Sequence, residues 1–244
     1  MTPTYYGDDL TYVHDVGHGD LARAAAQTLV ELLRRSGRAR GRVVDLGCGS
    51  GILARGALDA GYEVTGVDIS EAMIAAARER APEADLRVGS YLDAEIPSCV
   101  AVTAIGECFS YLFDQRLAGA GLDRLLERIH RALEPRGLLL FDVAAPGRVR
   151  GKSPQRSWQE GADWAVLVEV DEDVATRRLT RAITTFRASG GTWRRDHEVH
   201  ALRLYDRREL EPRVRGVGFT VRPLARYGAL RFGPGHIGFC ARKA

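Results

Sequence analysis

The stretch VVDLGCGSG, residues 43–51, decides the fold. A short apolar run leads into three glycines, and the ILARGALDAG that follows has the pattern of a helix. Glycines at such a strand-to-helix turn let the backbone approach a ligand, and the helix N-terminus favours negative charge. A second apolar run, residues 63–68, ends in Asp68, whose carboxylate is placed to accept both hydroxyls of a ribose. The pattern predicts a nucleoside-binding site.

The glycine spacing distinguishes between classes of nucleoside cofactor. A dinucleotide fingerprint needs glycines at i, i+2 and i+5, whereas here they stand at 47, 49 and 51. Asp45 lies two residues before the first of them. Its carboxylate would repel a pyrophosphate but could bind an ammonium group, directly or through water. The methionine part of S-adenosylmethionine carries such a group, so the spacing favours that cofactor.

Apolar strands alternate with amphipathic helices around this motif. A helix is expected at 20–36, with Asp20 as its N-cap and Gly37 just past its end. Two more are expected, one after the N-cap residue Ser70 and one at 115–133. Strands are expected at 86–89, 100–105, 138–143, 219–224 and 236–243, in addition to the two runs around the motif. Asp206 is the expected cap of one more helix. The order predicts an α/β, Rossmann-like, doubly wound fold with a mostly parallel seven-stranded sheet.

The pattern changes after Pro146-Gly147. Residues 148–157 read as a loop, and β-rich runs follow at 163–170, 178–186 and 192–204. If residues 188–191 form a four-residue turn, Phe186 lies opposite Trp193 and Arg181 lies opposite Glu198. Three parts are therefore predicted: an N-terminal cap segment at 1–19, a cofactor-binding domain at 20–147 and 206–244, and an antiparallel β insertion at 148–205 that acts as a substrate lid.

VVDLGCGSG and VTGVDIS resemble the first two motifs of the class I S-adenosylmethionine-dependent methyltransferases, of the bacterial small-molecule type, and ALEPRGLLLFDV resembles a later one. The resemblance implies methyl transfer from S-adenosylmethionine, with S-adenosylhomocysteine as product. It places Asp45, Gly47, Cys48, Gly49 and Gly51 around the methionine part and Asp68 on the ribose. Near the adenine it places Ile69, Met73, Ser90 and Tyr91, with Ser90 where the family usually has Asp. Gly106 lies where the family's backbone reaches the methionine or the substrate.

Methyl transfer needs alignment more than acid–base chemistry, because the methyl group on a sulfonium is already activated. The candidate base is His14, oriented by Asp15, or else a solvated or capping histidine. Glu107 could contact the methionine ammonium or the substrate, or hold a loop. Substrate-binding candidates are Tyr12, Tyr111, Arg181 and His200, although Arg181, His200 and Glu198 could equally form a structural row on one face of the hairpin.

Charge and composition limit the partners. The chain of 244 residues is 45% hydrophobic and 27% charged, as in globular proteins. Residues 1–175 contain 19 Lys and Arg against 27 Asp and Glu, and residues 176–244 contain 16 against 5, which would suit an anionic small-molecule substrate or reflect an arginine-rich genome.

Other features narrow the function classes. The four cysteines form no CxxC pair, so reduced buried thiols and no metal site are expected. Without an apolar span or signal peptide, a cytoplasmic protein that does not contact membranes is predicted. The sequence has no added RNA-binding domain, which argues against an RNA methyltransferase. That alternative stays open, as do a non-catalytic protein that binds the cofactor and a homodimer.

Overall fold

The computed structural model describes residues 5–244 and confirms the predicted α/β class. A seven-stranded sheet has the order β10-β13-β5-β4-β1-β2-β3. The pairs among β1–β5 are parallel, and β13 is antiparallel to β5 and β10. The bounds of these strands are β1 Arg42–Leu46, β2 Glu63–Asp68, β3 Asp85–Val88, β4 Cys99–Ala104, β5 Leu133–Ala144, β10 Phe219–Leu224 and β13 His236–Lys243.

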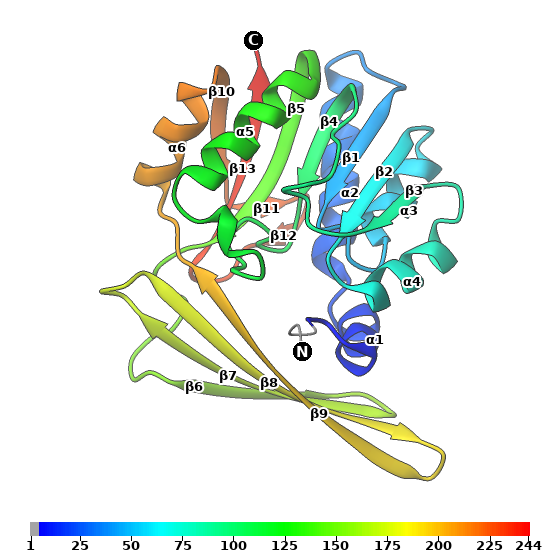
Figure 1. Ribbon diagram of the computed structural model, residues 1–244, viewed down its shortest axis with the longest axis vertical. Helices are drawn as coiled ribbons and strands as arrows, with labels where there is room; N and C mark the ends of the chain where they lie inside the picture. The colour runs from blue at the N-terminus through cyan, green and yellow to red at the C-terminus, as the bar shows by residue number, and fades with distance from the viewer. Residues whose placement is uncertain (1–4) are drawn as a thin grey trace.

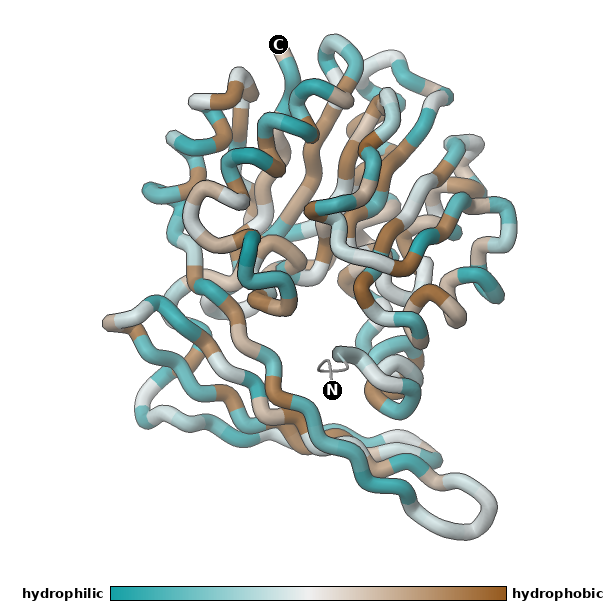
Figure 2. The backbone as a smooth tube through the Cα atoms, viewed as in Figure 1, coloured by the Kyte–Doolittle hydropathy of each residue, from teal (hydrophilic) through white to brown (hydrophobic). Residues whose placement is uncertain are grey.

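Helices cover both faces of this sheet, as the alternating pattern predicts (Figure 1). One apolar core lies between the sheet and α5 and α6, and a second lies between the sheet and α2 and α3. Hydrophobic residues follow the central strands, whereas one strand of the long hairpin is hydrophilic near the tip and the tip itself is pale, of intermediate hydropathy (Figure 2). The helices are α1 Asp8–Gly17, α2 Asp20–Arg35, α3 Ile52–Asp59, α4 Glu71–Arg80, α5 Ala120–Ala132 and α6 Arg207–Gly216, with a 3₁₀ turn, η1, at Gln115–Leu117.

A separate four-stranded antiparallel sheet lies across the carboxyl ends of the parallel strands, with α1 between the two sheets (Figure 1). Hydrogen bonds from Leu112 N to Ala201 O and from Arg203 N to Ser110 O, both 2.8 Å, tie this sheet to the loop after β4. Its strands are β6 Gln155–Glu160, β7 Trp164–Asp173, β8 Arg178–Ser189 and β9 Thr192–Arg203. Two short strands, β11 Arg226–Tyr227 and β12 Leu230–Arg231, form a separate two-stranded sheet. None of the helices within residues 5–244 is long and apolar enough to span a bilayer.

The structure corrects the predicted register of the hairpin. Gly190 and Gly191 form a two-residue turn with φ of +59° and +81°, so the strands continue through Ser189 and Thr192. Phe186 therefore lies opposite Arg195 rather than Trp193, and Arg181 lies opposite His200 rather than Glu198.

Two further expectations about local structure are wrong. Part of the 148–157 loop belongs to β6, a strand whose residues are all exposed and carry no apolar alternation. The second concerns the N-terminal cap segment, whose sequence shows neither strand nor helix periodicity; it contains α1, whose Leu10 and Val13 pack against Val166 and Ile183.

The predicted helix caps have mixed outcomes. Ser70 and Asp206 accept the N–H of Met73 and Glu209 at 3.1 and 2.8 Å, which confirms both. Asp20 instead begins α2 without capping it, and the N-cap residue is Gly19.

Candidate active site

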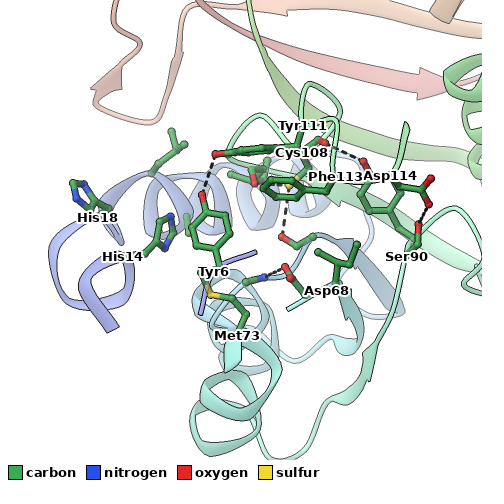
Figure 3. A pocket seen from close by; sticks show the side chains of 18 residues that line it. Tyr6, His14, His18, Asp68, Met73, Ser90, Cys108, Tyr111, Phe113 and Asp114 are labelled. Carbon is green, nitrogen blue, oxygen red and sulfur yellow. Dashed lines mark hydrogen bonds between the residues drawn. The ribbon is translucent and has the colours of Figure 1, made fainter. Parts of the chain in front are cut away.

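A cavity opens between the carboxyl ends of the parallel strands, α1 and the loop after β4 (Figure 3). It contains about 870 Å³ of empty space, part of it open to solvent. The residues around it are Tyr6, His14, His18, Leu21, Ala22, Gly47, Gly49, Asp68, Ile69, Met73, Ser90, Tyr91, Ile105, Gly106, Cys108, Tyr111, Phe113 and Asp114. The cavity thus joins the cofactor motifs to the N-terminal segment.

The glycine loop and Asp68 form one wall. Asp68 accepts the backbone N–H of Gly49 and of Ser70, each at 2.9 Å on a different oxygen. Each oxygen keeps a second lone pair, which fits the two hydroxyls of a ribose. Gly47 has φ +75°, and a Cβ there would lie 2.5 Å from Cys108 Sγ. The backbone conformation and the close packing both require glycine.

Asp45 lies beneath this loop and is not among the residues that border the cavity. It is 2% exposed and accepts the Thr103 hydroxyl at 2.6 Å. Burial raises the pKa of Asp45 to about 7, the Thr103 hydrogen bond opposes the rise, and the charge of Asp68 adds to it. A nearby cation would favour the ionised form, so the carboxylate has the chemistry to respond to an ammonium group.

Apolar side chains next to Asp68 form a surface for a flat ring. Ile69 and Met73 border the cavity from the start of α4, as the resemblance implies. Ser90 and Tyr91 also border the cavity, and the Ser90 hydroxyl donates to Asp114 at 2.7 Å. The hydrogen bond from Arg116, which has the larger effect, and the one from Ser90 lower the pKa of Asp114 to about 2. The residues present therefore fit adenosine: a ribose carboxylate, an apolar slot and a second carboxylate at its far end.

The N-terminal segment forms the opposite wall, where His14 of α1 and His18, the C-cap residue of this helix, both border the cavity (Figure 3). Among the described residues, His14 Nδ1 is buried and has no hydrogen-bond partner. Burial is the main cause that lowers the pKa of His14 to about 4, and the neighbouring His18 adds to it, so the ring is neutral at pH 7.

Asp15 does not orient His14, contrary to expectation. Its carboxylate binds both terminal nitrogens of Arg80, each at 2.8 Å, and accepts the Ser50 hydroxyl at 2.5 Å. Asp15 therefore ties α1 to the glycine loop and to α4.

A hydrogen-bonded chain runs from the cavity wall to Glu107. Tyr6 and Tyr111 share a hydroxyl hydrogen bond of 2.9 Å, and Arg181 donates to Tyr111 at 3.0 Å and to Glu107 at 2.6 Å. Arg148 also pairs with Glu107. Glu107 is 5% exposed and does not border the cavity, so it lies behind the wall.

Strand β9 holds the N-terminal wall in place. Glu198 accepts the backbone N–H of Tyr6 at 2.7 Å and of Gly7 at 2.8 Å, and also binds His200 Nε2 at 2.8 Å. His200 is fully buried, and its ring lies 4.9–6.1 Å from those of Tyr5, Tyr6, Tyr111 and Phe113. The predicted shared face for Glu198, His200 and Arg181 is confirmed by the register, but these side chains contact the wall rather than the cavity.

Other predicted site residues also lie outside the cavity. Cys48 packs with Ile74, Ala77 and Leu86 under α4, and Gly51 caps α3. Tyr12 donates to Asp163 at 2.8 Å and lies under the Arg187 guanidinium. By contrast, His14, Tyr111 and the remaining predicted cofactor residues, Gly47, Gly49, Asp68, Ile69, Met73, Ser90, Tyr91 and Gly106, border the cavity.

The sequence analysis gave no site role to Phe113, Asp114 and Asp142. The first two lie in an irregular loop after β4, where no periodicity marks them. Asp142 stands in the apolar strand β5, and the only available signal was that a buried carboxylate needs partners.

The arginines of the basic C-terminal third do not border the cavity. Within the described residues, the charged side chains around it are Asp68 and Asp114, with no Lys or Arg. Arg187 and Arg194 both pair with Asp9, and Arg181 with Glu107, so part of the positive excess neutralises acids of the N-terminal part.

Comparisons with known proteins support the same class of protein. A family model described as a methyltransferase domain matches residues 43–137. The dTDP-3-amino-3,6-dideoxy-alpha-D-glucopyranose N,N-dimethyltransferase of Streptomyces fradiae is 26% identical over 88% of this chain and 86% of its own. A malonyl-[acyl-carrier protein] O-methyltransferase of Enterobacter lignolyticus (strain SCF1) is 34% identical over 54% of this chain and 49% of its own.

A solved structure shares the fold over nearly the whole chain. It is that of an S-adenosylmethionine-dependent methyltransferase from Clostridium acetobutylicum ATCC 824, with a TM-score of 0.80, 15% identity and coverage of 96% of both chains. The match includes the seven-stranded sheet that carries the glycine loop and Asp68. The motifs, the fold and the match of residues 43–137 to a methyltransferase-domain model together support a class I S-adenosylmethionine-dependent methyltransferase.

Proposed function

We propose that the protein transfers a methyl group from S-adenosylmethionine to a small molecule bound between α1 and the loop after β4. The observation that carries this proposal is the single cavity that the cofactor residues Gly47, Gly49 and Asp68 share with His14 and Tyr111. A long nucleic acid would need an open basic surface, whereas this cavity is walled by aromatic rings and has no Lys or Arg around it within residues 5–244.

The cofactor, when bound, supplies a methyl group on a positively charged sulfur. The residues of this chain would hold and orient it: Asp68 on the ribose, Ile69 and Met73 against the adenine, and the backbone around Gly47 and Gly106 beside the amino-acid part. Asp45 contributes a buried negative charge below that part, which the ammonium group would neutralise.

On the substrate side the chain aligns the nucleophile and excludes water. With the cofactor bound, the lone pair of the substrate atom would form the new bond to the methyl carbon, and the electrons of the broken carbon–sulfur bond would stay on sulfur. His14, which borders the cavity and is neutral at pH 7, would accept a hydrogen bond through a ring nitrogen from the O–H or N–H that attacks. With a pKa of about 4, His14 orients this group and is a weak base, so it would remove a proton only from a strongly acidic product.

The substrate end of the cavity favours an uncharged or amine-bearing molecule over the anion that the charge distribution predicts. No Lys or Arg lies around the cavity within residues 5–244, and the aromatic rings of Tyr6, Tyr111 and Phe113 would suit a neutral ring or an amine. The similar protein from Streptomyces fradiae is named for dimethylating the amino group of a dTDP-linked sugar, which supports an amine as the group that is methylated, although that sugar carries an anionic diphosphate.

A transfer assay with label on the methyl group tests this proposal. The protein is incubated with labelled cofactor and either the low-molecular-mass fraction or the RNA fraction of a bacterial extract. We expect label in the low-molecular-mass fraction, and less of it with Asp68→Ala, while Asp85→Ala, an exposed carboxylate on β3, acts as wild type. Label in RNA alone would refute the proposal, and no transfer with intact cofactor binding would favour a non-catalytic binding protein.

A further inference from the structure

Asp142 gathers four hydrogen-bond donors behind the loop after β4, which borders the cavity. Its carboxylate is fully buried at the end of β5 and accepts the backbone N–H of Gly106 at 3.1 Å and of Glu107 at 2.7 Å. It also binds the Tyr227 hydroxyl at 3.0 Å and His236 Nε2 at 2.9 Å. A buried carboxylate is costly unless such partners satisfy it, so the residue joins β5, the loop after β4 and the C-terminal region at one point.

The loop that Asp142 holds has an unfavourable backbone conformation. Gly106 has φ +85° and Glu107 has φ +66°, and the left-handed region is disfavoured for a non-glycine residue such as Glu107. In a trans peptide the carbonyl points opposite to the N–H, so the bond from Glu107 N to Asp142 turns the Gly106 carbonyl away from β5. Gly106 and its neighbours Ile105 and Cys108 border the cavity beside Gly47.

We propose that Asp142 is a positioning residue for the methionine half of the cofactor. It does not border the cavity. It fixes residues 105–107 so that their backbone lies next to the amino-acid end of the ligand and the Gly106 carbonyl points away from β5. Tyr227 and His236 hold the carboxylate from the other side. The inference rests on the proposed function, because only a bound S-adenosylmethionine or S-adenosylhomocysteine has an amino-acid end to position.

Two ligands distinguish a loss of positioning at the amino-acid end of the cofactor from a general loss of binding. S-adenosylhomocysteine carries the amino-acid end, and 5′-methylthioadenosine has the same adenosine and sulfur without it. Calorimetry measures both for wild type, Asp142→Asn and the control Glu211→Gln, a buried carboxylate on α6 that pairs with Arg207 and Arg215. Asp142→Asn keeps the size of the side chain but replaces one acceptor with a donor. We expect S-adenosylhomocysteine to bind about tenfold more weakly to it or worse, 5′-methylthioadenosine to bind unchanged, and the control to match wild type.

Equal weakening of both ligands, or unchanged binding of S-adenosylhomocysteine, would overturn the inference. If wild type bound neither ligand, the proposed function would fail first. Should Asp142→Asn not fold, Tyr227→Phe removes one of the four donors and leaves the carboxylate in place. It should lower the ratio of the two affinities in the same direction by a smaller factor, and an unchanged ratio would contradict the proposal.

Discussion

Replacing Gly47 with Ala tests the packing of the glycine loop against the loop after β4. The new Cβ would lie 2.5 Å from Cys108 Sγ and 3.3 Å from Cys108 Cβ, and the backbone has φ +75°. The left-handed conformation costs roughly 1–2 kcal/mol for a non-glycine residue, and overpacking adds about 1–3 kcal/mol. The lower entropy of the unfolded chain offsets about 0.4–1 kcal/mol, so we expect Gly47→Ala to lose about 2–4 kcal/mol of unfolding free energy.

The double variant Gly47→Ala/Cys108→Ala isolates the contact from the backbone strain. Removing Sγ relieves the 2.5 Å contact and leaves the 3.3 Å one, so stability should partly recover. Urea unfolding of wild type, both single variants and the double variant gives the coupling energy, which we expect to be about 1–3 kcal/mol. The same four proteins are titrated with S-adenosylhomocysteine, because a displaced Cys108 side chain would enter the cavity that it borders.

Strict additivity of the two changes would refute this reasoning. It would mean that Cys108 turns aside at no cost, and that the loops are less closely packed than the structure shows. Unchanged ligand binding by Gly47→Ala would contradict the assignment of this loop to the cofactor.

Three further predictions concern charge and the N-terminal wall. Because the pKa of Asp45 is raised to about 7 and a bound ammonium would lower it, calorimetric affinity for S-adenosylhomocysteine should rise as pH increases from 6 to 8, and Asp45→Asn should flatten that rise. His14 has a folded pKa of about 4 against an unfolded value near 6.5, so the unfolded chain binds more protons between these values; stability should fall by up to about 3 kcal/mol as pH drops through that window, and His14→Gln should remove this part of the urea-unfolding profile. Asp15→Asn, which breaks the bidentate pair with Arg80, should speed dissociation of S-adenosylhomocysteine about tenfold in stopped-flow measurements, with unchanged dissociation counting against a capping role for α1.

Much of the fold could be predicted because its signals are local. The strands at 219–224 and 236–243 match the structure residue for residue, and Ser70 and Asp206 cap their helices as expected. Buried parallel strands read as apolar runs, and a capping side chain acts within three residues of its own position.

The parts that were missed depend on tertiary contacts. The residues of β6 are all exposed, so it is a strand only because it pairs with β7. The helix α1 places Leu10 and Val13 against the four-stranded sheet, which a single short segment cannot reveal. The hairpin register depended on whether the turn has two or four residues, and consecutive positive φ angles at Gly190 and Gly191 decided it.

The candidate site was predicted in its cofactor half and less well in its substrate half. Asp68 and the glycines lie in a motif whose spacing reflects the ligand. Glu107 was a candidate for contact with the cofactor or the substrate, and Arg181 and His200 for contact with the substrate, each with a structural role as the alternative. Their side chains face one another or the aromatic wall. Whether a polar side chain reaches the cavity or stabilises its wall depends on partners that come from elsewhere in the chain.

The most direct test of the central claim is calorimetric binding of S-adenosylhomocysteine to wild type and to Asp68→Ala, with Asp85→Ala as the control. Asp68 borders the cavity and presents both carboxylate oxygens, each already oriented by one backbone N–H. Hydrogen bonds to a charged group contribute about 1.5–3 kcal/mol, so loss of the ribose contacts should weaken binding at least about tenfold. Wild type and the control should bind one molecule each with equal affinity. Unchanged binding by Asp68→Ala, or no binding by wild type, would contradict the account.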